Sequence, residues 1–194
     1  MTGFSENRHW PADLLLKAAS IRFVVFDIDG VMTDGRLYRD DAGNEIKAFH
    51  SRDGLGLKGL MRHGFIVAAL TARTSRLVTA RMAELGIEHV KQGRHDKRQA
   101  LAELLRETGF SAEQTAYMGD DLVDWPAMVQ TRLKLCPGDA DGWILQHVDY
   151  ATCAHGGRGA AREACELLLA AAGKLDAWRA EFEAINNSSA DNAA

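Results

Sequence analysis

The chain has 194 residues, of which 46% are hydrophobic and 26% charged, and this is the composition of an ordinary globular protein. Its formal net charge of −4 argues against a nucleic-acid-binding protein, which usually carries a basic footprint. The three cysteines form no CxxC pair and no zinc spacing, so we expect reduced thiols. No apolar run reaches the ~18 residues of a membrane span and no signal peptide is visible, which leads us to expect a cytoplasmic protein.

Helices and strands are expected to alternate along the chain. A helix is predicted within residues 10–20, where Pro11 can occupy the first turn, and the apolar run at 21–26 predicts a buried strand. Two short extended runs around the Gly/Asn turn at 41–44 predict a β-hairpin across residues 35–49. The elements predicted after the hairpin are helices at 55–63, 75–85 and 97–108, strands at 65–70, 87–90, 115–118, 133–136 and 147–152, and a helix from about Ala160.

This alternation predicts the α/β fold class, as a three-layer, doubly wound, Rossmann-like parallel sheet with helices on both faces and the β-hairpin as a flap. We expect a single domain over residues 1–194, with its core at about 21–172. The small polar residues at about 186–194 predict a disordered tail.

Residues that can carry chemistry follow three of the predicted strands. Asp27 and Asp29 come directly after the first strand, Thr71 after the second, and Asp120 after a later one, while Lys97 begins a helix between them. Because ligands of open parallel sheets bind beyond the carboxyl ends of the strands, these side chains are expected to converge. Each alone has an ordinary explanation as a turn cap or a solvated surface group, so their convergence is what predicts a site.

The convergent groups suit phosphoryl transfer. Carboxylates at Asp27 and Asp120 are hard oxygen ligands of the kind that Mg²⁺ prefers. A metal-neutralised Asp27 can attack phosphorus to give an aspartyl-phosphate, and Asp29 can protonate the leaving alcohol and then deprotonate the attacking water. Thr71 and Lys97 can hold the phosphoryl oxygens as charge builds on them. These residues predict a magnesium-dependent phosphatase.

Four segments resemble the motifs of the haloacid dehalogenase superfamily of phosphohydrolases. FDIDGVMTDG at 26–35 is similar to the first motif, LTAR at 70–73 to the second, Lys97 to the third and GDDLVD at 119–124 to the fourth. The resemblance covers about residues 21–165 and agrees with the chemistry inferred from the residues alone.

By this resemblance Asp27 is the nucleophile and a metal ligand, Asp29 is the acid/base and binds the metal through its backbone carbonyl, and Asp120 completes the protein ligands. Asp121 and Asp124 are expected to support the site without direct metal contact, or to sit favourably at a helix N-terminus. P-type ATPases of the superfamily carry Thr where this chain has Asp29, so the Asp fits rapid hydrolysis, or a phosphomutase.

Many members of the superfamily carry a cap domain that closes over small substrates. Residues 34–70 hold one hairpin and one helix, and residues 71–97 hold one helix and a short strand, so neither interval has room for a cap. The resemblance therefore implies an open site, which either accepts a macromolecule or is closed by a neighbouring subunit. The missing cap also argues against a phosphomutase, which must retain its intermediate.

A finer resemblance is to the family of 3-deoxy-D-manno-octulosonate 8-phosphate phosphatases, which are capless tetramers. It is carried by FHSRDGLG at 49–56, TARTS at 71–75, QG at 92–93 and GGRGAARE at 156–163. It implies hydrolysis of this eight-carbon sugar-acid phosphate to the free sugar acid and phosphate, in lipopolysaccharide precursor synthesis, by a homotetramer. One departure is Ala72, where the family often has Gly.

The resemblance also implies a set of substrate contacts. Arg73 and Arg81 are the best candidates for binding the distal carboxylate, because an arginine can bind it through two parallel hydrogen bonds. Gly157 and Arg158 are possible contributors to a neighbouring subunit's site. The full set of expected substrate-binding residues is Asp29, Arg52, Asp53, Gly54, Lys58, Arg73, Arg81 and Lys97.

Two alternatives remain open from the sequence. One is a phosphatase for a nine-carbon, sialic-acid-type 9-phosphate, which would use the same catalytic residues. The other is a non-catalytic assembly domain, related to the one at the C-terminus of some sialic-acid-activating synthetases.

Lys58, which stands where some relatives have Arg, weakens any bidentate carboxylate contact at that position.

Overall fold

The computed structural model describes residues 9–190, with side chains described to residue 183. The helices are α1 (Ala12–Ala18), α2 (Ser51–Arg62), α3 (Arg76–Leu85), α4 (Lys97–Thr108), α5 (Trp125–Met128), α6 (Gly142–His147), α7 (Ala160–Ala171) and α8 (Leu175–Ala190). The strands are β1 (Phe23–Phe26), β2 (Tyr38–Arg39), β3 (Glu45–Ile46), β4 (Ile66–Leu70), β5 (His89–Lys91), β6 (Thr115–Met118), β7 (Leu133–Cys136) and β8 (Tyr150–Ala151).

Six of these strands form one parallel sheet in the order β5-β4-β1-β6-β7-β8. The chain builds the sheet outward from β1, first through β4 and β5 on one side and then through β6, β7 and β8 on the other. The order therefore reverses at β1, and ligand sites of such sheets lie beyond the carboxyl ends of the strands at this reversal. The predicted doubly wound parallel sheet is confirmed.

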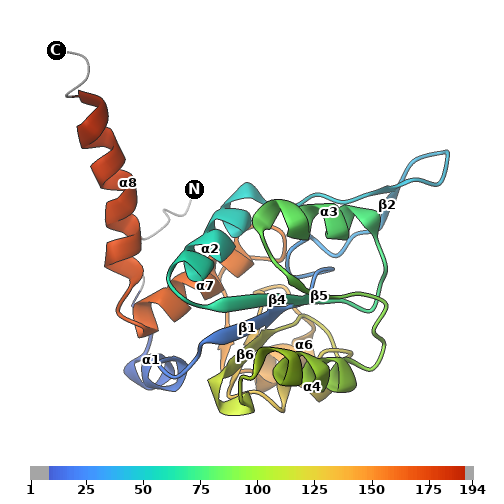
Figure 1. Cartoon of the computed structure of the whole chain (residues 1–194). Coiled ribbons are helices and arrows are strands. Elements are labelled where there is room, and N and C mark those ends of the chain that lie inside the picture. The colour runs from blue at the N-terminus through green and yellow to red at the C-terminus, as the bar shows by residue number, and fades with distance from the viewer. Residues whose placement is uncertain (1–8, 191–194) are drawn as a thin grey trace.

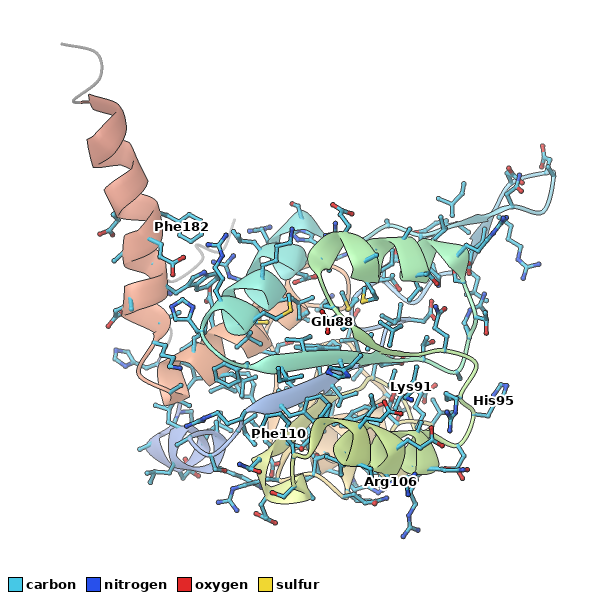
Figure 2. The ribbon with its side chains drawn as sticks, viewed as in Figure 1. Glu88, Lys91, His95, Arg106, Phe110 and Phe182 are labelled. Atoms are coloured by element: carbon cyan, nitrogen blue, oxygen red, sulfur yellow. The ribbon has the colours of Figure 1, made fainter. Side chains whose placement is uncertain are left out.

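Helices cover both faces of the sheet, with α2, α3 and α7 on one face and α4 and α6 on the other (Figure 1). The β1 strand divides its side chains between the two cores, with Val24 and Phe26 in one and Phe23 and Val25 in the other. Phe110, which follows α4, stacks on Phe23 with ring centroids 5.7 Å apart (Figure 2). Burial on both faces explains why the strand reads as a continuous apolar run.

The predicted helix boundaries are confirmed where a cap residue marks them. Ser75 caps α3 by accepting a hydrogen bond from the Leu77 amide, at 3.3 Å. Gly86 and Gly109 end α3 and α4 in the left-handed conformation that glycine adopts without strain.

One predicted boundary is wrong. Helix α2 begins at Ser51, four residues before the predicted start, because the His50 side chain caps it by accepting from the Arg52 amide. Helix α8 continues to Ala190, and its first turns are anchored by the buried Trp178. The disorder predicted over residues 186–194 stays a prediction. Residues 191–194 of that predicted tail lie outside the described part of the chain.

The predicted hairpin is confirmed as β2 and β3, which pair in antiparallel register with Tyr38 opposite Ile46. Figure 1 shows it projecting away from the body of sheet and helices, and Leu37 and Ile46 on it are exposed. Among residues 9–190, none of the helices combines the length and apolar character needed to cross a membrane.

Candidate active site

The carboxyl ends of the three central strands bring together the residues predicted to do so. Asp27 follows β1 directly, and its amide donates to the Met118 carbonyl of β6 at 2.9 Å. The Lys97 ammonium, at the first position of α4, lies 3.0 Å from Asp27 Oδ2 and 2.6 Å from Asp124 Oδ1. One carboxylate oxygen each from Asp27, Asp120 and Asp124 lies within 4.8 Å of the others. The predicted convergence is therefore present.

Asp27 is a buried carboxylate with one unused oxygen. Burial raises its pKa well above the usual value, the negative charge of Asp124 adds to this, and Lys97 opposes it. Burial alone would lower the pKa of Lys97, but the two carboxylates outweigh it and raise that pKa, so the ammonium stays charged. Oδ1 of Asp27 has no hydrogen-bond partner among the described residues. A buried carboxylate oxygen without a partner is costly unless a ligand completes it.

Asp120 and Asp124 play different parts in the carboxylate cluster. Asp124 accepts hydrogen bonds from Lys97, from the Tyr117 hydroxyl at 2.8 Å and from the Asp120 amide at 3.3 Å, so its oxygens are already used. Burial and the neighbouring Asp124 raise the pKa of Asp120 to about 7. A Cβ atom at Gly30 would collide with the Asp120 carboxylate, so only glycine allows this close approach.

These residues fit a hard divalent cation. Asp27 and Asp120 each present a carboxylate whose ionised form is disfavoured by burial, and a cation would relieve both. Asp124 lies in the same cluster, and its predicted supporting role stays a prediction. Asp121 is exposed, and its Oδ1 accepts from the Leu122 amide at 2.7 Å, which is a local turn contact.

Asp29, two residues beyond Asp27, is held from several sides. Oδ1 forms an ion pair with Lys47, while Oδ2 lies 3.5 Å from the Thr71 hydroxyl and 3.8 Å from Arg73 Nε. Lys47 was not predicted as a site residue, because its segment reads as an ordinary surface ribbon. The Thr71 hydroxyl also accepts from the Arg73 amide at 3.2 Å, which fixes its orientation.

Arg73 lies in the site beside Asp29, and the Arg81 guanidinium lies close to Gly54. Arg73 donates from Nη2 to Glu45 at 3.0 Å besides lying near Asp29. Arg81 ion-pairs with Glu84 at 2.9 Å, and a Cβ atom at Gly54 would lie 2.5 Å from its Nη2. The Nε atoms of both arginines are buried and have no hydrogen-bond partner among the described residues.

Asp53, an expected substrate-binding residue, lies in the first turn of α2 and is buried. Its carboxylate accepts from the Arg162 amide at 2.8 Å and from the Gly159 amide at 3.4 Å. Asp53 therefore caps the N-terminus of α7, which joins α2 to α7. Sequence reasoning missed this role, because the two segments lie more than one hundred residues apart.

The remaining predicted contacts lie at the surface of α2 and at the N-terminus of α7. Arg52 and Lys58 are exposed on α2, and Arg52 lines a surface pocket together with Arg158.

The glycine-rich segment before α7 packs on the catalytic loop of its own chain. The Gly157 amide donates to the Val31 carbonyl at 2.9 Å, and a Cβ atom at Gly157 would lie 2.5 Å from the Thr33 carbonyl carbon. At Gly156 a Cβ atom would collide with the Gly30 carbonyl. Glycine here allows the loop after β1 to be covered, and any contribution of Gly157 and Arg158 to a neighbouring subunit stays a prediction.

Comparison with known proteins places this chain in a family. No protein-family model matches the chain. The 3-deoxy-D-manno-octulosonate 8-phosphate phosphatase KdsC of Escherichia coli K12 is 44% identical over 165 residues, which are 85% of this chain and 88% of that protein.

Solved structures agree with this relationship. The 3-deoxy-D-manno-octulosonate 8-phosphate phosphatase of Moraxella catarrhalis, in complex with magnesium ion, phosphate ion and KDO, has a TM-score of 0.85 and 39% identity over 88% of this chain and 98% of that one. A haloacid dehalogenase superfamily hydrolase of subfamily III A from Legionella pneumophila has a TM-score of 0.84 and 41% identity over 88% and 93%. The chain therefore belongs to the haloacid dehalogenase superfamily and, within it, to the family of 3-deoxy-D-manno-octulosonate 8-phosphate phosphatases.

Proposed function

We propose that this chain is a magnesium-dependent phosphatase that hydrolyses 3-deoxy-D-manno-octulosonate 8-phosphate to the free sugar acid and phosphate. The observation that carries the proposal is the buried Asp27 carboxylate, which has an unpartnered oxygen beside Lys97 and Asp120 at the reversal point of the sheet. The 44% identity to phosphatases named for this substrate supports the choice of sugar. A role in lipopolysaccharide precursor synthesis follows from that substrate.

Asp27, Asp120 and the backbone carbonyl of Asp29 are the proposed ligands of Mg²⁺. When bound, the cation supplies positive charge that offsets the repulsion between these carboxylates and a phosphate dianion. The raised pKa values of Asp27 and Asp120 support this assignment, because burial disfavours both ionised groups until a cation is present.

The chain's own residues account for two half-reactions. Lys97 holds Oδ2 of Asp27, and together with the Thr71 hydroxyl it binds the phosphoryl oxygens. The Asp27 carboxylate attacks phosphorus, the bond from phosphorus to the sugar oxygen breaks, and Asp29 donates its proton to that oxygen. Asp29 then takes a proton from water, the water oxygen attacks the aspartyl-phosphate, and phosphate leaves as the Asp27 carboxylate is regenerated.

Arg73 and Arg81 are the proposed partners of the sugar-acid carboxylate. Arg73 lies at the site, with its Nε 3.8 Å from Asp29 Oδ2, and Arg81 has a buried Nε without a hydrogen-bond partner among the described residues. Gly54 supports the assignment of Arg81, since the missing side chain leaves room for the guanidinium. Arg52, Asp53 and Lys58 have weaker support, because Asp53 caps α7 and the other two are exposed.

We also propose that the chain works as a homotetramer, in which the open site is closed by a neighbouring subunit. The hairpin gathers exposed apolar side chains at Leu37, Tyr38 and Ile46, with Tyr38 opposite Ile46, and this supports the proposal because exposed apolar side chains that gather in one place are typical of a contact surface.

A substrate comparison tests the proposed function. We expect kcat/KM with Mg²⁺ to be at least about tenfold higher for the eight-carbon 8-phosphate than for a nine-carbon, sialic-acid-type 9-phosphate, since one displaced polar contact has about that effect. A preference for the nine-carbon substrate would shift the assignment to the related phosphatase. Absence of phosphate release from both would favour a non-catalytic assembly domain.

A further inference from the structure

Lys47 is a buried lysine on an otherwise exposed hairpin. Its side chain is 2% exposed, whereas the preceding Ile46 is 54% exposed. The chain at the end of β3 therefore turns the Ile46 side chain outward and the next one, Lys47, inward toward Asp29. The Lys47 ammonium forms an ion pair with Asp29 Oδ1 and lies 3.5 Å from Glu45 Oε1.

Glu45 connects Lys47 to the segment after β4, which carries Arg73 and Ser75. Its Oε1 accepts from Arg73 Nη2 at 3.0 Å, and its Oε2 accepts from the Ser75 hydroxyl at 2.5 Å. These hydrogen bonds, with that from Ser75 the strongest influence, hold the pKa of Glu45 below its usual value, so it is ionised. Glu45 is thus a charged bridge between the hairpin and the loop after β4.

The contacts close into a ring of alternating charge: Asp29, Lys47, Glu45, Arg73 and back to Asp29. Burying a single lysine ammonium is costly unless it is paired, so this arrangement is unlike an incidental surface contact. Asp29 meets one cation at each oxygen, Lys47 at Oδ1 and Arg73 at Oδ2. A carboxylate held at both oxygens keeps one orientation, and a proton donor must have that orientation relative to the leaving oxygen.

We propose that Lys47 is a positioning residue for Asp29, and that Glu45 holds Lys47 and Arg73 in place for this purpose. The hairpin (Figure 1) then builds part of the catalytic centre of its own chain, in addition to any contact with other subunits. This inference rests on the proposed role of Asp29 as acid/base. It assigns Lys47 no direct contact with the reacting atoms.

A double-mutant cycle between Lys47 and Asp29 tests the inference. Lys47→Met keeps the length of the side chain and removes its charge, and we expect kcat to fall about 10- to 100-fold while KM changes less than about threefold. In an Asp29→Asn background the same substitution should lower kcat by less than about threefold, because its effect acts through Asp29. Equal fold-losses in the two backgrounds would overturn the proposal.

Three further variants keep the test decisive. Arg39→Met removes an exposed cation from the same hairpin and should leave kcat within about twofold of the wild type. Lys47→Arg retains the positive charge and should recover a large part of the lost kcat, and Glu45→Gln should lower kcat in the direction of Lys47→Met. A merely structural Lys47 would instead lower the folded fraction, measured by circular dichroism, at unchanged kcat per folded molecule.

The two proposals fail in different ways. If the wild type releases phosphate from the sugar phosphate and Lys47→Met does so equally well, the positioning role is wrong and the proposed function stands. If the wild type releases none, the proposed function is wrong, and the cycle is then measured with p-nitrophenyl phosphate. With that substrate, retained activity of Lys47→Met would also overturn the positioning role.

Discussion

Asp124 shows how a side chain without a chemical step shapes the catalytic centre. It is fully buried, and it accepts from Lys97, from Tyr117 and from the backbone of the loop that carries Asp120. These contacts fix the ammonium that orients Asp27 and also the loop that presents Asp120. Burial raises the pKa of both neighbouring carboxyls and the negative charge of Asp124 adds to this, so a bound cation would relieve both groups.

Metal binding at this cluster is tested by thermal unfolding. Mg²⁺ at about 100 times its Kd stabilises a folded protein by about 2.7 kcal/mol, which raises Tm by roughly 5–10 °C for a chain of this size. We expect this rise in the wild type and its loss in Asp120→Asn. Asp121→Asn is the matched control, because its exposed carboxylate bonds only locally, and it should keep the rise. A rise in Asp120→Asn equal to that of the wild type would contradict the assignment.

The same carboxyl predicts how the metal-free protein responds to pH. Asp120 ionises near 3.8 when unfolded and at about 7 when folded, so the folded state binds more protons between these values. The free energy of unfolding should therefore fall as pH rises through this window and level off above it. Asp27 acts in the same direction. Urea unfolding in EDTA measures this pH dependence, and Asp120→Asn should flatten the profile. An unchanged slope in that variant would contradict the assignment of the raised pKa to Asp120.

Among the elements, α2 is the one whose close packing is least evident from its sequence. Its three interior glycines each face a neighbouring group: a Cβ atom would meet Arg81 at Gly54, Arg162 at Gly56 and Trp178 at Gly59. The glycines let α2 approach α7 and the first turns of α8 closely. The close packing therefore outweighs the low intrinsic helix propensity of these glycines.

Gly59→Ala tests this packing. A Cβ atom there would lie 2.6 Å from the Trp178 ring, which Arg162 also covers with 4.4 Å between guanidinium carbon and ring centroid. Because the indole is buried and cannot move freely, we expect a loss of roughly 1–3 kcal/mol in the free energy of unfolding.

Gly142→Ala is the control for that substitution. Gly142 begins α6, and a Cβ atom there meets nothing within 4 Å, so the change should be neutral or slightly stabilising. Urea denaturation measures both variants. Equal effects of the two substitutions would show that α8 does not depend on the close approach at Gly59.

The fold was predictable from the sequence where local signals decide an element, and not where distant contacts do. The strands and most helix boundaries followed from apolar runs and from local caps such as Ser75 and Gly86, which act within a few residues. The start of α2 did not, because the advantage of its glycines lies in contacts with distant helices.

The residues of the site also divide into those that the sequence predicted and those that it did not. Asp27, Asp29, Thr71 and Asp120 were predictable because a rule of topology places strand ends together. Lys47 was not, since whether a ribbon lysine turns inward depends on where the hairpin docks. The capping role of Asp53 was missed for a similar reason, because its partner, the N-terminus of α7, is distant in sequence.

At the scale of the whole molecule, a hairpin and the glycine-rich segment before α7 flank the edge of the sheet that carries Asp27 and Asp29. The described residues between Asp29 and Thr71, and between Thr71 and Lys97, form no cap domain. The hairpin contributes Lys47 and Glu45 inward and exposes Leu37 and Ile46 outward. One short ribbon is therefore proposed both to orient the acid/base and to meet other subunits, which compensates for the missing cap.

The central claim is that this edge hydrolyses the sugar phosphate through Asp27. The most direct measurement is steady-state phosphate release from 3-deoxy-D-manno-octulosonate 8-phosphate with Mg²⁺, for the wild type and for Asp27→Asn. We predict multiple turnovers by the wild type and at least about a 10³-fold lower kcat for the variant, with its circular dichroism spectrum unchanged. Turnover by Asp27→Asn at the wild-type rate, or no release by the wild type, would contradict the account.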